Sequence, residues 1–310
     1  MKNKKILITG GLGFIGSHIV NELINDNKII IVDNLSTGNI KNLNDSTHPN
    51  LKIVIEDICK VNFDKLTVDI DYIFHLAAMA NVPLSIGNPV RCNEVNLDAT
   101  VRLLSSAVKN NVKKVIFSSS CSVYGNNENI PLKETEALMP ASPYAASKAG
   151  CEQYLDAFHE DYGLSYVALR YFNVFGIKQD KNSEYGAVIP NFISAILDGE
   201  KPIIYGDGEQ TRDFVYVDDV VRANIAACKS DYNGPLNVAS GKKLTINQLY
   251  EIIKTTLGSD MEPDYQPERP GDIKHSQADI SNLEKINLKI NSDDFEKQII
   301  ETVEWFRIIL

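Results

Sequence analysis

The sequence is poor in the features that stabilise small secreted proteins and in those that anchor proteins in membranes. Its five cysteines are odd in number and lack CxxC spacing, so neither a disulfide framework nor a zinc site is indicated, and we expect no bound metal. No stretch approaches the roughly 20 apolar residues that a membrane-spanning helix requires. The basic residues 1–5 precede only a short apolar run, which predicts no targeting segment. These absences favour a soluble protein of the reducing cytoplasm.

Positive charge is in deficit as well. The chain carries 31 lysines and arginines against 41 aspartates and glutamates, a formal net charge of -10. This balance argues against nucleic acid or an anionic membrane as a partner, although it leaves room for a local cationic pocket that binds phosphates. With 310 residues, of which 44% are hydrophobic, the chain can bury a large core.

Short apolar runs alternate with helical stretches through the first half of the chain. Apolar residues at helical spacing, such as Ile15, Ile19 and Leu23, follow the first run. Repeated units of this kind predict an α/β fold, a Rossmann-type doubly wound parallel sheet with helices on both faces. We expect strands at residues 5–9, 28–33, 52–56, 72–76, 115–118, 166–170 and 235–238, and helices at 14–25, 90–110, 144–162, 188–198, 218–227 and 246–257.

The pattern becomes less regular after about Asn173, where clusters of glycine, proline and charged residues suit loops that hold a substrate. We therefore expect a dinucleotide-binding domain at residues 1–175, to which 214–238 return. Residues 176–213 and 239–310 are expected to form a smaller C-terminal substrate-binding α/β region. Because no flexible linker is evident, this second region should pack closely against the first.

A glycine-rich turn, with Gly10, Gly13 and Gly16, follows the first predicted strand and opens the first predicted helix. Glycine permits the tight turn and lets the backbone approach a pyrophosphate, while the helix N-terminus offers N–H groups and partial positive charge. The motif alone is weak evidence. Its position between a strand and a helix makes it a credible dinucleotide site.

Asp33 ends the second predicted strand, 17 residues after Gly16, where a carboxylate accepts hydrogen bonds from an adenosine ribose. No lysine or arginine immediately follows it, so we expect NAD rather than NADP. The alternative is an aspartate that caps the next turn. Asp57 follows another predicted strand. We give equal weight to two interpretations of it, a contact with adenine and a purely structural role.

Tyr144 and Lys148 are spaced to share one face of a helix that Ser142 and Pro143 are suited to begin. An ammonium beside a phenol lowers the phenol's pKa, which ordinarily lies near ~10, and so helps it act as a base. An exposed Tyr/Lys contact is the ordinary interpretation of this spacing alone. Only the other motifs give it a catalytic meaning.

Four motifs occur in the order typical of the extended short-chain dehydrogenase/reductases. They are Thr9-Gly10-x-x-Gly13-x-x-Gly16, His75-Leu76-Ala77-Ala78, Ser118-Ser119-Ser120-x-x-x-Tyr124-Gly125 and Tyr144-x-x-x-Lys148. The chain resembles this family, with its NAD-dependent epimerases and dehydratases, nearly end to end. Segments 33–38, 170–173 and 206–214 look most like the UDP-glucose 4-epimerase branch.

The resemblance implies that Ser120, Tyr144 and Lys148 are catalytic. Tyr144 would take the proton of the sugar 4-hydroxyl, Ser120 would hydrogen-bond that hydroxyl, and Lys148 would bind the nicotinamide ribose and favour the tyrosinate. The implied NAD contacts are Gly10, Gly13, Phe14, Ile15, Gly16, Asp33, Asn34, Ser36, Thr37, Gly38, Asp57, Ile58, Leu76, Ala77, Ala78, Asn96, Ser118, Tyr144, Lys148 and Phe172.

The resemblance also implies a UDP-sugar site. Arginine suits a diphosphate because guanidinium donates paired hydrogen bonds without losing its charge, although isolated arginines more often form surface ion pairs. The implied contacts are Asn173, Arg212 and Arg269 at the diphosphate, Val188, Ile203 and Tyr205 at uracil, Asp272 at a ribose hydroxyl, and Ser120, Tyr144 and Ser276 at the sugar.

The implied activity is an isomerase reaction, the NAD-dependent C4 epimerisation of UDP-glucose and UDP-galactose through a transient 4-keto sugar. Related dehydratases and some decarboxylases carry an acid just after the position of Ser120, where Cys121 and Ser122 stand here. This difference favours simple epimerisation. A UDP-glucuronate 4-epimerase or decarboxylase-like relative remains an alternative, and so does a non-catalytic NAD-binding sensor or scaffold, which would not need Ser120, Tyr144 and Lys148 together.

Ser276 aligns with a bulky tyrosine of some hexose-restricted epimerases. The small side chain leaves room for a 2-acetamido group, so we hypothesise activity on UDP-GlcNAc and UDP-GalNAc as well. A solvent-facing Ser276 is the alternative. The sequence does not decide which UDP-sugar is physiological or in which direction the reaction runs.

Several residues depart from the family or have a structural interpretation. Ala80 replaces a lysine that usually contacts the cofactor, and residues 176–180 replace an arginine-containing loop, which puts cofactor retention in doubt. We expect His75 and Tyr124 to be buried structural residues, and we weigh function and structure equally for Ser118, Ser119 and Ser122. The family also implies a homodimer that pairs the helices at 90–110 and 144–162.

Overall fold

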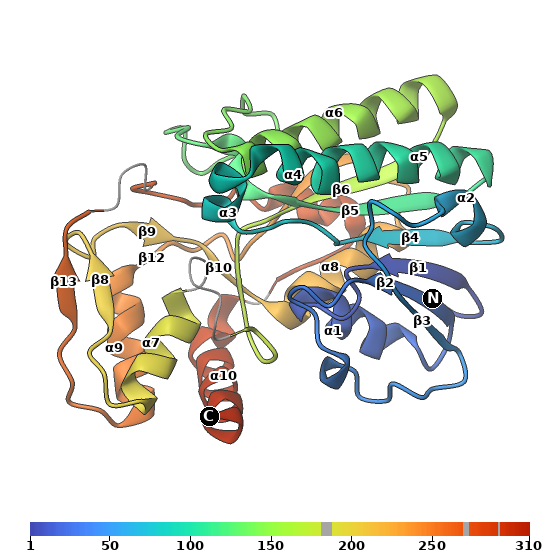
Figure 1. The fold of residues 1–310 in the computed structure, drawn as a ribbon. Helices are drawn as coiled ribbons and strands as arrows, with labels where there is room; N and C mark the ends of the chain where they lie inside the picture. The colour runs from blue at the N-terminus through green and yellow to red at the C-terminus, as the bar shows by residue number, and fades with distance from the viewer. Residues whose placement is uncertain (181–187, 269–272, 291) are drawn as a thin grey trace.

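The structure, a computed structural model, describes residues 1–180, 188–268, 273–290 and 292–310. Seven parallel strands form a central sheet in the order β11-β6-β5-β4-β1-β2-β3 (Figure 1). From β1 the order runs one way through β2 and β3 and the other way through β4 to β6, which confirms the Rossmann-type doubly wound fold. The strands are β1 Lys5–Thr9, β2 Lys28–Asp33, β3 Leu51–Ile55, β4 Tyr72–His75, β5 Lys114–Ser120, β6 Ser165–Tyr171 and β11 Gly234–Val238.

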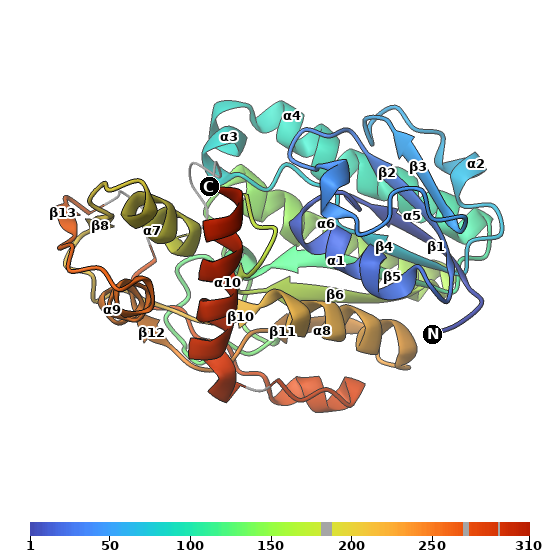
Figure 2. The ribbon, with the colours of Figure 1, turned by 90° about the horizontal axis from the view of Figure 1, so that it is seen from below.

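Helices cover both faces of this sheet. Helices α1 (Phe14–Leu23) and α8 (Val217–Lys229) lie on one face, and α5 (Ala99–Lys109) and α6 (Pro143–Tyr162) lie on the other (Figure 1, Figure 2). Alternate residues of a strand point to opposite faces, so Ile8 packs with the first pair and Leu7 with the second. Continuous apolar strands are therefore buried on both sides.

The helix predicted at 90–110 is divided in the structure. The chain forms α3 (Val82–Gly87), α4 (Pro89–Asn93), a π-helical turn at Glu94–Asp98 and then α5. Pro89 suits the start of α4, and Asn88 caps it by accepting a hydrogen bond from the Arg91 nitrogen at 3.1 Å. The π turn faces Asn96 inward, where it is 2% exposed. No glycine or proline inside 94–98 marks this turn in the sequence.

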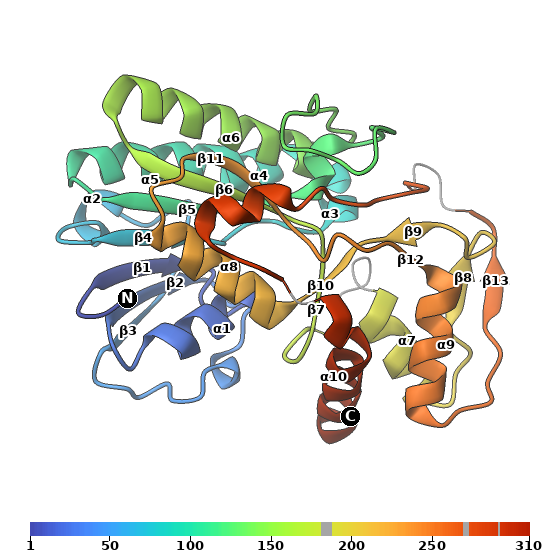
Figure 3. The ribbon, with the colours of Figure 1, turned by 180° about the vertical axis from the view of Figure 1, so that it is seen from behind.

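A smaller lobe stands beside the sheet (Figure 3). Its helices α7 (Val188–Leu197), α9 (Ile246–Leu257) and α10 (Phe295–Ile309) share a core that includes Phe192, Tyr250 and Phe306. The short strands pair as β7 (Asn173–Phe175) with β10 (Phe214–Tyr216), β8 (Ile203–Tyr205) with β13 (Asp264–Gln266), and β9 (Thr211–Arg212) with β12 (Leu244–Thr245).

The C-terminal helix α10 was not predicted, although Ile299, Val303 and Phe306 have helical spacing and are fully buried. The remaining elements are the short helix α2 (Phe63–Leu66) and the 3-10 turns Ile40–Asn42, Cys121–Tyr124, Ser281–Ile286 and Ser292–Asp294. Strand β3 lies one residue earlier than expected. Within the described ranges no helix combines the length and apolar character needed to cross a membrane.

Candidate active site

The glycine-rich turn joins β1 to α1 and packs against the backbone that follows β4. Gly10 has a φ of 69°, and a Cβ there would lie 2.8 Å from the Ala77 nitrogen. A Cβ on Gly16 would lie 2.1 Å from the Gly10 carbonyl oxygen, so the turn closes only without side chains. Among the described residues no side chain caps α1, whose N-cap is Gly13. The first N–H groups of α1 therefore suit a pyrophosphate, which fits NAD.

The other expected cofactor contacts lie along the same edge of the sheet. Carboxyl ends of parallel strands meet at one edge, and ligands of such sheets bind there. The structure brings together at this edge Phe14 and Ile15 after the turn, Asp33 at the end of β2 with residues 34–38 behind it, Asp57 and Ile58 after β3, Leu76 to Ala78 after β4, Ser118 in β5 and Phe172 after β6.

Asp33 links the glycine-rich turn to the loop after β2. Its carboxylate accepts hydrogen bonds from the Leu12 nitrogen at 3.0 Å and the Leu35 nitrogen at 2.9 Å. A Cβ at position 38 would lie 2.7 Å from this carboxylate, which explains Gly38. Asn34, Ser36 and Thr37 are exposed around it. A ribose hydroxyl would share Asp33 with these backbone donors.

Asp57 forms an ion pair that the sequence did not reveal. Arg91 donates to the Asp57 carboxylate, and also to the Cys59 sulfur at 3.3 Å. Burial alone raises the pKa of Asp57, but the hydrogen bonds from Cys59 and the charge of Arg91 hold that pKa below its usual value. The adenine contact of Asp57 stays a prediction, and Arg91 joins the residues around it.

Tyr144 and Lys148 lie on α6 as expected. Ser142 caps the helix by accepting a hydrogen bond from the Ala145 nitrogen at 3.1 Å, Pro143 is its first residue, and Tyr144 lies in its first turn. The Lys148 ammonium lies 5.9 Å from the centre of the Tyr144 ring and 4.7 Å from that of Phe117. The two side chains therefore share one face at the carboxyl edge of β5.

Burial controls the ionisation of both groups. It raises the pKa of Tyr144 to about 12, against which a hydrogen bond from the Ser120 side chain acts. It lowers the pKa of Lys148 to about 8. The Lys148 Nζ donates to the Ser118 carbonyl oxygen at 2.6 Å, so the protein itself holds this ammonium in place. Further positive charge in the site would ease the ionisation of Tyr144.

The three serines that end β5 have different partners. The Ser118 hydroxyl lies 3.1 Å from the Tyr171 hydroxyl, and the Ser119 hydroxyl donates to Glu152 at 2.5 Å. The Ser120 oxygen accepts a hydrogen bond from the Ser122 nitrogen at 3.2 Å. A hydroxyl that accepts a hydrogen bond can still donate its own proton, so Ser120 can act as a donor to Tyr144 or to a substrate oxygen.

The residues after Ser120 supply no ready acid. Burial raises the pKa of the Cys121 thiol to about 12, so the thiol stays protonated. The Ser122 hydroxyl oxygen is buried and has no hydrogen-bond partner among the described residues. A buried hydroxyl without a partner suits a site that a polar ligand completes.

Two buried polar residues have structural partners. His75 lies between the Thr9 hydroxyl at 2.6 Å and the Thr100 hydroxyl at 2.8 Å, and burial together with the nearby Lys148 charge lowers its pKa to about 3. This agrees with the expected structural role. The Asn96 amide donates to the Ser147 hydroxyl at 2.9 Å and accepts from the Met79 nitrogen at 2.7 Å. Asn96 thus holds the loop after β4 against α6.

Arg212, an expected diphosphate contact, lies on the short strand β9, which pairs with β12. Neighbouring Asp213 is fully buried and accepts hydrogen bonds from the Ser240, Gly241 and Ala278 nitrogens. Burial raises the pKa of Asp213 to about 6, against these hydrogen bonds. The Asp213 carbonyl also accepts a hydrogen bond from the Asn173 nitrogen at 3.0 Å. Asp213 therefore fixes the segment that carries Arg212.

Ser276 lies next to this segment. Its nitrogen donates to the Thr211 carbonyl at 3.1 Å, and the residue is 7% exposed. Ser276 is therefore buried beside β9, which contradicts a solvent-facing position. The expected diphosphate and ribose contacts Arg269 and Asp272 lie outside the described residues.

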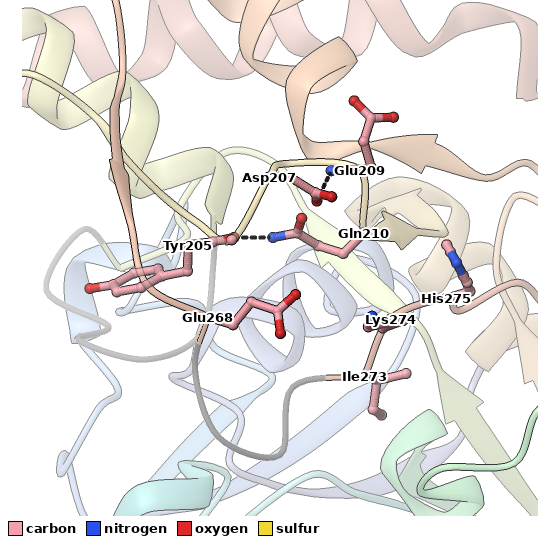
Figure 4. A pocket seen from close by; sticks show the side chains of 9 residues that line it. Tyr205, Asp207, Glu209, Gln210, Glu268, Ile273, Lys274 and His275 are labelled. Atoms are coloured by element: carbon pink, nitrogen blue, oxygen red, sulfur yellow. Dashed lines mark hydrogen bonds between the residues drawn. The ribbon is translucent and has the colours of Figure 1, made fainter.

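A cavity of about 170 Å³ opens between the end of β8, the turn after it and the segment that leads to Ser276 (Figure 4). Gln210 donates from its amide to the Tyr205 carbonyl at 2.7 Å, and Glu268 lies opposite. Ile203 is 46% exposed at the start of β8, and Val188 begins α7. The cavity is lined by Tyr205, Gly206, Asp207, Glu209, Gln210, Glu268, Ile273, Lys274 and His275.

Comparisons with known proteins agree with this arrangement. Residues 6–239 match the NAD dependent epimerase/dehydratase family. A UDP-glucose 4-epimerase of Mycolicibacterium smegmatis is 35% identical over 309 residues, which cover 98% of each chain.

Two solved structures are also similar. A UDP-N-acetylglucosamine 4-epimerase from Methanobrevibacter ruminantium, in complex with UDP-N-acetylmuramic acid, is 60% identical with a TM-score of 0.99 and full coverage of both chains. The UDP-glucose 4-epimerase of Thermotoga maritima, with UDP-glucose, is 41% identical with a TM-score of 0.91, covering 98% of this chain and 99% of that one. This chain therefore belongs to the NAD-dependent epimerase/dehydratase family, whose fold and cofactor chemistry its own residues fit.

Proposed function

We propose that the protein epimerises a UDP-hexose at C4 with NAD as a tightly held cofactor. The observation that carries this proposal is the meeting of Ser120, Tyr144 and Lys148 at the sheet edge that the glycine-rich turn faces. A protein that only binds a dinucleotide needs the turn and Asp33 but has no use for these three side chains.

Tyr144 is the proposed base for the sugar 4-hydroxyl, and Ser120, whose oxygen accepts a hydrogen bond from the Ser122 nitrogen, is proposed to donate its own proton to that hydroxyl. Bound NAD would supply the hydride acceptor and donor for C4 and, in its oxidised form, a positive charge in the site. Lys148, fixed by Ser118, supplies a second positive charge and a donor for the ribose. Tyr144 gives its proton back after the 4-keto sugar has turned over in the site.

The remaining cofactor roles follow the placement of the residues. Gly10, Gly13 and Gly16 are proposed to hold the pyrophosphate, and Asp33 the adenosine ribose. The proposed contacts with the rest of the cofactor are Phe14, Ile15, Asn34, Ser36, Thr37, Gly38, Asp57, Ile58, Leu76, Ala77, Ala78, Asn96, Ser118 and Phe172.

The nucleotide end of the substrate is assigned to the smaller lobe. Arg212 and Asn173, which Asp213 holds together, are proposed to meet the diphosphate. The cavity at Tyr205 is the proposed place of the uridine, with the remaining contacts at Val188, Ile203, Arg269 and Asp272.

We infer that the enzyme also accepts a 2-acetamido group. Ser276 is buried beside β9, and we propose that its small side chain leaves room for the acetamido group where a tyrosine would not. The similarity to a UDP-N-acetylglucosamine 4-epimerase at 60% identity supports this substrate. Undetectable turnover of UDP-GlcNAc, with good turnover of UDP-glucose, would contradict it.

The test of the function is an activity panel. Purified protein is incubated with UDP-galactose, UDP-GalNAc and UDP-glucuronate, and the 4-epimers, the decarboxylated product and any 4-keto sugar are separated by chromatography. Epimerisation of the first two supports the proposal. A uronate epimer or pentose product favours the uronate alternative, and no conversion with NAD present favours a sensor or scaffold.

The proposal includes two domains. We propose an NAD-binding domain at 1–175 with 214–238, and a nucleotide-sugar domain at 176–213 and 239–310.

The free thiol state of all five cysteines, each within the described residues, is compatible with a cytoplasmic enzyme. A homodimer through the helical segments 90–110 and 144–162 is proposed because the second of them exposes Tyr154 and Tyr162, and analytical ultracentrifugation tests it.

A further inference from the structure

A chain of buried hydrogen bonds lies directly behind the reacting residues. Glu152, one turn after Lys148 on α6, accepts the hydrogen bond of the Ser119 hydroxyl at 2.5 Å. Arg170 on β6 donates to both oxygens of the Glu152 carboxylate, with the shortest contact at 2.6 Å. Glu152 and Arg170 are each 3% exposed. Glu152 and Arg170 thus form a buried ion pair, and its carboxylate accepts a hydrogen bond from a hydroxyl group of β5.

The far end of this chain is fixed as well. Arg170 donates to the Tyr124 hydroxyl at 2.9 Å, and that hydroxyl donates to the Asn237 side chain at 2.6 Å. The Asn237 nitrogen donates to the Glu134 carboxylate at 2.8 Å. Because Arg170 is held by these partners, it holds the Glu152 carboxylate in one orientation.

A buried ion pair of this kind is poor evidence for added stability, because the desolvation of two charges offsets their attraction. Its position is more informative. Ser119 stands between the Ser118 carbonyl, which accepts from the Lys148 ammonium at 2.6 Å, and Ser120. The Ser118 hydroxyl is bound to Tyr171 on the opposite face of the sheet, so the end of β5 is held from both sides.

We propose that Glu152 is a positioning residue. Through Ser119 it fixes the end of β5, so that the Ser118 carbonyl holds the Lys148 ammonium and Ser120 stays beside Tyr144. This inference rests on the proposed role of Tyr144 as the base.

Loss of the Ser119 bond has a defined consequence. The ammonium loses its fixed position 5.9 Å from the Tyr144 ring, and Ser120, whose hydrogen bond lowers the pKa of Tyr144, loses its place beside the phenol, so we expect the phenol to ionise at higher pH. The titratable groups that face Lys148 are Tyr144, Cys151 and Glu152 on its own helix, Cys92 on α4 and His75 on β4.

Ser119→Ala removes the link while leaving the ion pair intact, and Ser119→Thr restores a hydroxyl. We expect Ser119→Ala to lower kcat about tenfold with little change in KM, because misplacement of reacting groups acts on the chemical step. The acid limb of the kcat profile should move to higher pH, and Ser119→Thr should return it towards the wild-type position. Glu152→Gln leaves Arg170 unpaired and can unfold the protein, so the test rests on Ser119.

A second measurement follows Tyr144 itself. In the protein carrying [¹³Cζ]tyrosine and its NAD, the Tyr144 signal is assigned by its loss in Tyr144→Phe, and we expect it to titrate at higher pH in Ser119→Ala. The matched control is Asn282→Ala, which removes only the outer hydrogen bond to Glu134 at 2.7 Å. This control should lower the melting temperature without moving either titration.

An unchanged acid limb and Tyr144 titration in Ser119→Ala, with activity lost only in proportion to the folded fraction, would overturn the positioning role. That result differs from failure of the proposed function, in which wild-type protein converts no UDP-sugar at all.

Discussion

Lys178 donates a hydrogen bond to the carbonyl oxygen of Asn42 at 2.8 Å, which ties the loop after β7 to the loop after β2. The Asn42 amide donates in turn to the Leu12 carbonyl of the glycine-rich turn at 2.9 Å. The proposed nucleotide-sugar domain is therefore connected to the backbone that is proposed to hold the pyrophosphate. This connection anchors the loop after β2 through the ammonium of Lys178.

Lys178→Met should weaken cofactor retention because it frees the loop after β2 from this anchor. We expect the Kd of NAD to rise about tenfold, the loss of one hydrogen bond from a charged donor. The NAD content of purified protein, released by acid and quantified, measures this directly. Lys52→Met on the exposed edge strand β3 is the control, and an equal NAD content in both variants would contradict the prediction.

Tyr144→Phe removes only the phenol oxygen from the first turn of α6. Because a positioned base contributes on the order of a thousandfold, kcat should fall by about that factor while bound NAD and the circular dichroism spectrum stay unchanged. A coupled assay of UDP-glucose formation provides the measurement. Retention of more than a tenth of the activity would remove Tyr144 from the proposed mechanism.

His75 makes the protein sensitive to acid. Its pKa is about 3 in the folded protein and 6.5 ordinarily, so the unfolded chain binds the proton more tightly, and stability falls as pH drops below 6.5. Between pH 7 and pH 5 this residue should cost about 2 kcal/mol of the free energy of unfolding. Urea unfolding at both pH values measures it. His75→Gln should show a smaller difference between the two curves, and an undiminished difference would assign the effect to other groups.

Ser276→Tyr should separate the two proposed substrate classes. The bulky ring is expected to exclude an acetamido group from the region beside β9, so turnover of UDP-GalNAc should fall at least tenfold relative to that of UDP-galactose, as steric exclusion of a ligand group predicts. Ser276→Ala, which keeps the space, should leave the ratio of kcat/KM values near that of the wild type. Equal losses on both sugars in Ser276→Tyr would show that position 276 does not select the sugar.

The sequence was sufficient for the sheet because its strands are continuous apolar runs that only a doubly covered parallel sheet can bury. It was also sufficient for the start of α6, where Ser142 and Pro143 are local signals. The π turn at 94–98 escaped prediction because the tertiary contacts of Asn96, rather than a local signal, hold it. Helix α10 was missed although its apolar spacing is regular.

Some residues of the candidate site could likewise be predicted from the sequence, and others could not. The glycines and the Tyr144/Lys148 pair were visible as spacing, whereas Arg91 and Arg170 acquire their roles from partners far away in the sequence. Glu152 did carry a local signal, since it follows Lys148 by one helical turn. The sequence alone does not indicate which group a carboxylate at this position contacts. The structure shows that its partner is the Ser119 hydroxyl.

The route of the chain between the sheet and the smaller lobe limits how the enzyme can be redesigned. After β6 the chain enters the lobe, returns through β10 and α8 to place β11 beside β6, and then enters the lobe again. A graft of substrate preference from a relative must therefore exchange two separate segments at once, together with the Asp213 contacts that join them. A single transplanted cassette would carry half of a binding surface and leave its complement behind.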